Sequence, residues 1–410
     1  MPEKKYTNAL MDEMRKFGDP PADGAIEALS NVRQLQAVQQ MLDQMITNDD
    51  VIPANIPMEV ATFWEESQAK ANSAAIVIAE GEVFFAEHGP EIILVLGFYS
   101  LPMDYAARGV RVLFDTGYLV THPNRRLLET MQMVIDVMSP GGLAPGGNGI
   151  TTALKVRLMH AAIRYLLRNG QGSVPGSNPP RSYPIWDLTL GVPINQEDMA
   201  GTLMSFSFLV LDGLRKLGID VSPNEELAFL QAWRVVGTIL GVNSKVIPET
   251  MEEARELTEL IISRQVRPSE ESRLMTAKLL EMYQENVTGP IFRGVPAALM
   301  RRFLPKGVAD KLGVPKSLFY SALVRIVGTI TVYADRFLKF GTDKSLYRRF
   351  SLSFIQFMIN MKRGGVRPNF AIPTELDKDW RVSPQFRRKT AMESVKSYLR
   401  PPPAPSAPPN

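Results

Sequence analysis

Residues 155–167, KVRLMHAAIRYLL, decide our fold prediction. The segment consists largely of Ala, Leu, Met, Lys and Arg, which are good helix formers, and no Gly or Pro interrupts it. A Gly/Pro-rich stretch at 139–149 comes before it and Asn169-Gly170 follows it, which are typical signals for the start and end of a helix. We therefore expect a helix here, with other helices packed around it.

Three polar side chains share one face of this predicted helix. At about 100° per residue, Arg157, His160 and Arg164 fall within an arc of roughly 60°. Imidazole is the commonest metal ligand in proteins, and guanidinium groups bind carboxylates and phosphates. A haem, which has an iron and two propionates, would suit such a face. The same spacing also fits an interior or surface histidine beside solvated arginines, and one histidine on a helix does not decide between the two.

The composition restricts the kinds of metal site that the chain can form. It has no Cys, which excludes disulfides, zinc–thiolate sites, iron–sulfur clusters and a thiolate-ligated haem. The histidines number three, so a three-histidine site would need His88, His122 and His160 together. The formal net charge of +3 is too small to indicate a nucleic-acid partner.

The N-terminus and the apolar runs show no signal peptide and no membrane-spanning segment. The opening MPEKK is not followed by the apolar segment of a signal peptide, and there is no twin-Arg signal. The longest apolar runs, near 92–98 and 206–211, are far too short to cross a bilayer. We expect a cytoplasmic, soluble monomer without a transmembrane segment, although a trimmed chain would be compatible with secretion.

Helical periodicity recurs along the chain, whereas no strand-like alternation or fixed-period repeat is present. We predict an all-α fold with a single large helical domain over residues 23–385. Residues 1–22 are expected to form a flexible arm, and residues 386–410 a tail that ends in a disordered Pro-rich segment. The segment 199–217 is strongly apolar, so it is predicted to form one central helix.

Two glycine-rich loops flank the helix that carries His160. The loop at 139–149 lacks the Lys-Ser/Thr ending of a nucleotide-binding loop and follows a helix rather than a strand, so we reject that function. The loop at 169–184 is long and rich in Gly, Ser and Pro. Loops of this length inside a domain are often functional, and we expect it to act as a lid.

Several motifs occur together in the middle of the chain. They are Arg126-x-x-x-Thr130, Met138, the Gly-rich loop, VRLMHAAIR at 156–164, GVPINQED at 191–198, and Trp233-Arg234. In this order and at these separations, over roughly residues 85–250, the sequence resembles the rubber oxygenase family. That family includes the latex clearing proteins and the oxygenases that cleave the terpenoid side chain of a mycophenolic acid precursor.

The resemblance implies an all-helical fold with a globin-like core around haem b. By the match of motifs, His160 would be the proximal iron ligand, and Arg157 and Arg164 would lie near the haem edge and its propionates. Arg126 and Thr130 would lie toward the distal side. The implied reaction adds both atoms of O₂ across a carbon–carbon double bond of a polyisoprenoid chain, such as poly(cis-1,4-isoprene), and leaves an aldehyde and a ketone end. The partners would be this hydrophobic substrate and O₂.

One position departs from the family pattern. Before the motif threonine the rubber-cleaving branch typically has a lysine that can cap the distal iron, whereas this chain has Glu129. Glu129 is a candidate for the base that removes an allylic proton, as are Asp104 and Asp115, and Arg126 could steady such a carboxylate or polarise oxygen. Glu129 could equally be a solvated helix residue. An apolar channel for the alkene is expected from Leu127, Met131, Val134 and Met138.

Other functions remain open at this point. The substrate could be a smaller intracellular terpenoid or lipid alkene, or the chain could be a haem or O₂ sensor without turnover. A further alternative is binding to a membrane surface through Arg381, Arg387, Arg388, Lys389 and Lys396.

Overall fold

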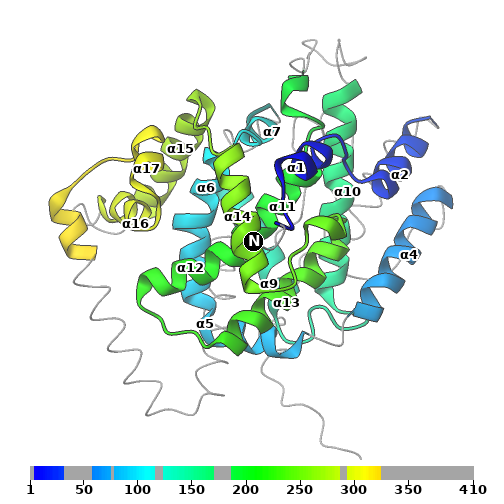
Figure 1. Cartoon of the computed structure of the whole chain (residues 1–410), viewed down its shortest axis with the longest axis horizontal. Helices are drawn as coiled ribbons and strands as arrows, with labels where there is room; N and C mark the ends of the chain where they lie inside the picture. The colour runs from blue at the N-terminus through cyan, green and yellow to red at the C-terminus, as the bar shows by residue number, and fades with distance from the viewer. Residues whose placement is uncertain are drawn as a thin grey trace, which may run out of the picture.

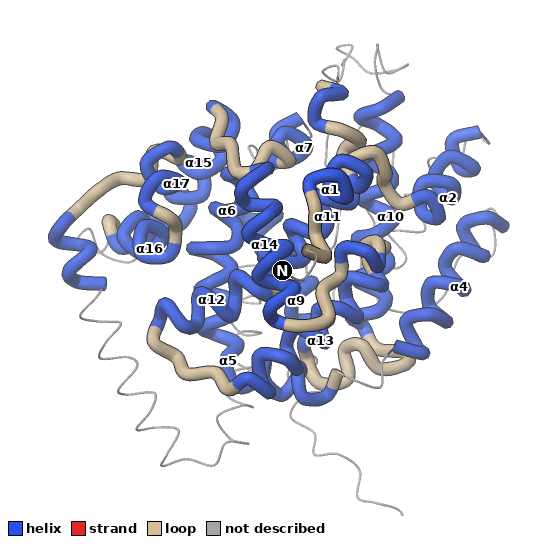
Figure 2. The backbone as a smooth tube through the Cα atoms, in the orientation of Figure 1, coloured by secondary structure: helices blue, strands red, loops and turns tan. Residues whose placement is uncertain are grey.

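The computed structural model describes residues 4–31, 58–74, 78–115, 123–169, 186–286 and 293–324. Within these ranges the chain consists of helices and their connecting loops, and the only β-type pairing is an isolated antiparallel bridge between Ala107 and Val266 (Figure 2). The all-α prediction is confirmed.

The described helices of the first half include one π-helix. They are α1 (Asn8–Met14), α2 (Pro20–Asn31), α4 (Met58–Ala74), α5 (Ala79–Val95), the π-helix η3 (Leu96–Ser100), α6 (Leu101–Ala106), α7 (Val110–Asp115), α9 (Pro123–Met138) and α10 (Asn148–Asn169).

The second half adds two short 3₁₀-helices to its α-helices. These elements are η4 (Leu188–Leu190), α11 (Gln196–Phe206), α12 (Phe208–Leu217), α13 (Pro223–Ile239), η5 (Ser244–Val246), α14 (Met251–Gln265), α15 (Glu270–Asn286), α16 (Val295–Phe303) and α17 (Lys306–Lys311).

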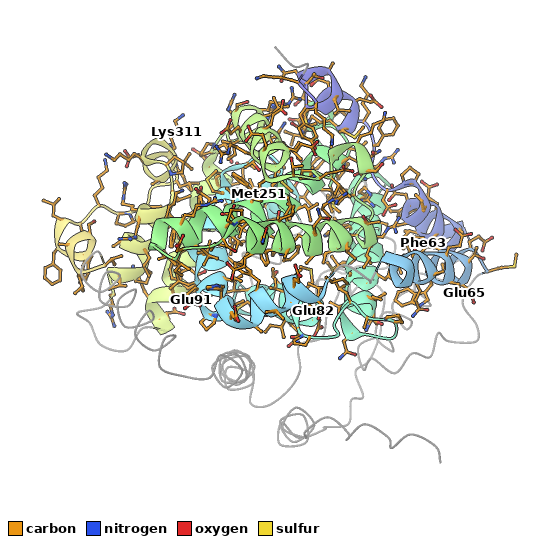
Figure 3. The ribbon with its side chains drawn as sticks, turned by 60° about the horizontal axis from the view of Figure 1, so that its bottom comes forward. Phe63, Glu65, Glu82, Glu91, Met251 and Lys311 are labelled. Carbon is orange, nitrogen blue, oxygen red and sulfur yellow. The ribbon has the colours of Figure 1, made fainter. Side chains whose placement is uncertain are left out.

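The described helices share one large hydrophobic core. The helix predicted from residues 155–167 is α10, which packs against α9 and α2, while α5 packs along α13. In Figure 1, α2 and α4 form one edge of the molecule and α16 and α17 the opposite edge. Figure 3 shows the same arrangement, with Phe63 and Glu65 of α4 far from Lys311 of α17. Side chains such as Trp233, Phe229 and Phe84 are almost fully buried in this core.

The segment 199–217 is apolar as expected, but it does not form one helix. It is divided into α11 and α12 at Ser207, whose φ of −110° and ψ of −79° interrupt the helix. The Ser207 hydroxyl donates a hydrogen bond to the carbonyl oxygen of Leu203 at 2.7 Å. A hydrogen bond from a serine side chain to the backbone of the preceding turn competes with regular helix geometry. No Gly or Pro at this position signals the break in the sequence.

The prediction of a flexible arm over residues 1–22 is wrong for residues 4–22. Tyr6, Met11 and Met14 lie in the hydrophobic core, each at most 2% exposed. The Arg15 guanidinium pairs with the buried carboxylate of Glu197 at 3.1 Å, and the Val192 backbone amide donates to the Arg15 carbonyl at 3.0 Å. The partners are about 180 residues away in sequence, so local composition gave no sign of them.

Some predictions concern segments outside the described residues. These are residues 170–184 of the predicted lid loop, His122, the part of the predicted helical domain after residue 324, the tail at 386–410 and the basic residues between 381 and 396. None of the described helices is both long and apolar enough to cross a membrane.

Candidate functional site

The Gly-rich loop at 139–149 brings α9 and α10 close together. A Cβ atom at Gly142 would lie 2.1 Å from the Asp136 carbonyl oxygen, and one at Gly149 would lie 2.6 Å from the same oxygen. The Gly149 amide also donates to the Gly142 carbonyl at 2.8 Å. Only glycine permits such approaches of backbone to backbone, so these glycines are required for the packing of the two helices.

A cavity of about 540 Å³ lies among the helices beside α9 and α10. Its walls come from α5, η3 and α6, from α9 and α10, and from α11, α13 and α14. Most of the lining side chains are apolar, with a small number of polar groups between them. This size and this mixture are typical of small-molecule and cofactor sites.

His160 lies at the edge of the face that α10 presents to this cavity. Val156, Met159 and Ile163 line the cavity together with His160. At about 100° per residue, these three side chains lie to one side of His160 around the helix, and Arg157 and Arg164 lie to the other. Of the two histidines among the described residues, only His160 lines the cavity. His88 is buried elsewhere, where its ring contacts Phe84.

The two arginines near His160 lie one layer behind the cavity wall. Arg157 binds Asp19 through Nε at 2.5 Å and Nη2 at 2.8 Å. Arg164 binds Asp23 through Nε at 2.7 Å and donates from Nη1 to the Ile194 carbonyl at 3.2 Å. Ile194 itself lines the cavity and has a left-handed φ of 50°, which is unusual for a β-branched residue. The arginines therefore do not reach the cavity, and Arg164 supports its wall.

The residues expected on the distal side come from α9. Glu129 and Thr130 both line the cavity, and Glu129 is only 2% exposed, so it is not a solvated helix residue. The backbone of Arg126 belongs to α9, but its side chain lies outside the described residues.

Three of the four residues expected to form an apolar channel line the cavity. They are Leu127, Met131 and Val134. Met138 instead belongs to the hydrophobic core, where it is completely buried.

The other two candidate bases have different surroundings. Asp104 lines the cavity, its Oδ2 accepts a hydrogen bond from the Ser205 hydroxyl at 3.0 Å, and burial raises the pKa of Asp104 to about 8. Asp115 does not line the cavity and accepts from Arg111 Nε at 2.7 Å. The structure thus brings His160, Glu129, Thr130 and Asp104 to one cavity and leaves Asp115 outside it.

Asp198, Trp233 and Gln265 are among the polar residues of the cavity wall that received no role from the sequence. Burial raises the pKa of Asp198 to about 6, although the Arg15 guanidinium opposes the shift. Trp233 is 1% exposed, and its indole N–H has no acceptor among the described residues. Gln265, at the end of α14, is 4% exposed. Asp198 and Trp233 belong to motifs that the sequence analysis singled out, whereas nothing in the sequence marked Gln265.

The π-helix η3 also borders the cavity. Its Gly97 carbonyl accepts a hydrogen bond from the Tyr283 hydroxyl at 2.9 Å, and the Phe98 and Tyr283 rings lie 4.5 Å apart between centroids. Leu96, Gly97, Phe98 and Tyr283 all line the cavity. Single-turn π-helices inside α-helical segments are frequently found at functional sites, which agrees with the position of η3.

Known proteins resemble this chain over most of its length. The family model described as "ER-bound oxygenase mpaB/B'/Rubber oxygenase, catalytic domain" matches residues 87–331. A rubber oxygenase from Streptomyces sp. (strain K30) is 26% identical over 317 residues, which are 76% of this chain and 73% of that protein.

The fold is also found among solved structures. The structure of latex clearing protein LCP in the closed state matches 83% of this chain and 90% of that one, with a TM-score of 0.67 and 22% identity. This likeness agrees with the predicted helical, globin-like fold. Since the family model covers more than half of the sequence, the chain belongs to the family of the ER-bound oxygenases mpaB/B' and the rubber oxygenases, which is a family of oxygenases.

Proposed function

We propose that the chain holds haem b in the cavity through His160 and uses it to cleave carbon–carbon double bonds of isoprenoid chains with O₂. The single observation that carries this proposal is the position of His160 on the wall of a largely apolar cavity of about 540 Å³, beside Glu129 and Thr130. The reaction balances without another reductant, because one alkene and one O₂ give one aldehyde and one ketone.

The residues around the cavity suit a haem. An imidazole is a common axial ligand, and apolar walls accommodate a porphyrin. The indole N–H of Trp233, which lacks an acceptor among the described residues, is available to an acceptor atom of a bound group. Arg164 supports the wall through the Ile194 carbonyl, and its buried Nη2 has no acceptor among the described residues. Arg157 donates hydrogen bonds to Asp19 and to the Ile239 carbonyl. We therefore propose that it stabilises the position of α10 and does not bind the cofactor.

Each part of the chain would then have a distinct task. When bound, the haem would supply the iron at which O₂ is activated. Leu127, Met131 and Val134 would hold an alkene that has no polar atoms near its double bond and would exclude water from it.

Glu129 would act as the base that takes up an allylic proton and returns it when the products form, with Thr130 beside it on α9. Asp104 suits the role of base less well. Burial raises its pKa to about 8, so it is mostly protonated at pH 7 and has no free carboxylate to accept a proton.

Incubation with alkenes under air tests the proposal. Carbonyl products of squalene or polyisoprene, spaced in mass by isoprene units, would support polyisoprenoid cleavage. Products from small terpenoid or lipid alkenes alone would favour the smaller substrates. No O₂ uptake with any alkene would refute the catalytic proposal and would favour a haem or O₂ sensor.

A further inference from the structure

One polar region of the cavity lies where α6, α11 and α14 meet. We call it the polar corner and define it as Asp104, Ser205 and Gln265. The Ser205 hydroxyl lies 3.0 Å from Asp104 Oδ2, which joins α11 to α6. Two backbone hydrogen bonds join the end of α6 to the end of α14, from the Arg108 amide to the Gln265 carbonyl and from the Arg267 amide to the Ala106 carbonyl, both at 2.9 Å. The relative positions of the three residues are therefore fixed by the fold.

The orientation of the Gln265 amide is also fixed. Its Nε2 donates to Glu197 Oε2 at 2.8 Å. Glu197 is fully buried and is bound by Arg264 Nε at 2.7 Å and by Arg15 Nη1 at 3.1 Å. A flipped amide would put its oxygen against the carboxylate, so only this orientation is compatible with Glu197.

The remaining atom of this amide, Gln265 Oε1, is buried and accepts no hydrogen bond from the described residues. Gln265 is 4% exposed and lines the cavity. A buried acceptor without a donor is costly, which is why such atoms in native proteins are rare and call for an explanation. A donor that enters through the cavity would remove this cost.

We propose that the polar corner binds a hydroxyl group of the substrate, which donates its proton to Gln265 Oε1. This inference rests on the proposed function, since it concerns the alkene held in the same cavity. The substrates would then be isoprenoid alcohols, whose hydroxyl group fixes the position of the chain along the cavity. A pure hydrocarbon polymer would leave Gln265 Oε1 without a donor.

The surroundings favour a hydroxyl over a cation. Glu197 already has two arginine partners, so its charge is compensated. Burial raises the pKa of Asp104 to about 8, so at neutral pH its carboxyl group is mostly uncharged and can donate to the oxygen of a hydroxyl. The unpartnered amide oxygen of Gln265 matches a neutral group that donates one hydrogen bond, such as a hydroxyl.

Geraniol and geranyl methyl ether form a matched pair of probes, because the ether keeps the chain and the oxygen but lacks the O–H. We would measure both dissociation constants by calorimetry on the full chain under argon, so that no oxygen is consumed. The wild type is expected to bind geraniol about tenfold more tightly than the ether, as for one hydrogen bond of ~1–1.5 kcal/mol. Equal affinities, or no binding of either probe, would overturn the proposal without any variant.

Two variants locate the effect. In Gln265→Met the tenfold preference should fall to about one, while the ether binds as before. Thr258→Val is the matched control, because Thr258 also lines the cavity but its hydroxyl already donates to the Ala254 carbonyl at 2.6 Å. Thr258→Val should keep the preference, and a preference that persists in Gln265→Met would reject Gln265 as its source.

The two proposals can fail separately. If the wild type consumes O₂ with squalene but binds geraniol and its ether equally, hydroxyl binding at the polar corner is refuted and the proposed function stands. If it prefers geraniol but consumes no O₂ with any alkene, hydroxyl binding at the polar corner stands and the proposed function is wrong.

Discussion

The Asp104→Asn substitution should stabilise the protein, and the stabilisation should grow as the pH rises. In the unfolded chain the Asp104 carboxyl ionises near its ordinary pKa of 3.8, whereas burial raises its pKa in the folded protein to about 8. The folded state therefore retains a proton that the unfolded state releases. As the pH rises from 4 toward 8, this difference increasingly favours unfolding of the wild type. Asn has the same shape, can still accept from Ser205, and does not ionise.

The size of the effect follows from the two pKa values. Each pH unit between them contributes ~1.4 kcal/mol, so the stability of the variant relative to the wild type should rise by up to about 4 kcal/mol between pH 4 and pH 7. Water in the cavity that solvates the carboxylate would reduce this figure without changing its sign. Urea unfolding of both proteins at four pH values in this range measures the difference directly.

Asp187→Asn is a control with the opposite sign. Asp187 is exposed, and a hydrogen bond from Thr189 lowers its pKa, so its charged form stabilises the folded state. This variant should therefore lose stability relative to the wild type as the pH rises through the acidic range. If the Asp104→Asn difference is constant or falls with pH, the carboxyl group is solvated and our description of this part of the cavity is wrong.

Three further predictions concern other parts of the molecule. Glu197→Gln should cost roughly 3 kcal/mol in urea unfolding, because it removes a fully buried carboxylate from two partly buried arginines, which keep only Asp198 and Asp12 as carboxylate partners among the described residues; a cost below about 1 kcal/mol, as for a surface pair, would contradict this. Gly213→Ala should cost about 1–3 kcal/mol, because its Cβ would lie 2.3 Å from Val95 Cγ1, whereas Gly24→Ala, with open space around it, should be neutral or stabilising. Glu129→Gln should lower O₂ uptake with an alkene by about 10²–10⁴ without changing haem content, and unchanged uptake would exclude Glu129 as the base.

The sequence predicted those features that depend on neighbouring residues. The helix around residues 155–167 appears as α10, because its helix formers and flanking glycines act locally. The position of His160 on the cavity wall agrees with the predicted polar face of this helix, but the cavity face continues to Val156, Met159 and Ile163 and not to Arg157 and Arg164. The resemblance over residues 85–250 led to the correct family, because it depended on several motifs in a fixed order.

Features that depend on distant partners were not predictable in this way. Asp19 and Asp23 bind Arg157 and Arg164 across about 140 residues, so the arginines appeared free to reach a cofactor when only their helix was considered. Gln265 lies at the cavity wall, and Glu197, on another helix, orients its amide. The break at Ser207 depends on one side-chain hydrogen bond that competes with the helix.

Hemin titration tests most directly whether His160 binds a haem in this cavity. The full chain would be titrated with hemin while the Soret band is recorded, together with His160→Ala and with His88→Gln, whose histidine is buried against Phe84 away from the cavity. We predict one hemin per chain with a Soret band in the wild type and in His88→Gln, and loss of that band in His160→Ala although the protein remains helical by circular dichroism. A wild type that binds no hemin, or a His160→Ala variant that binds it as tightly and with the same spectrum, would contradict our account.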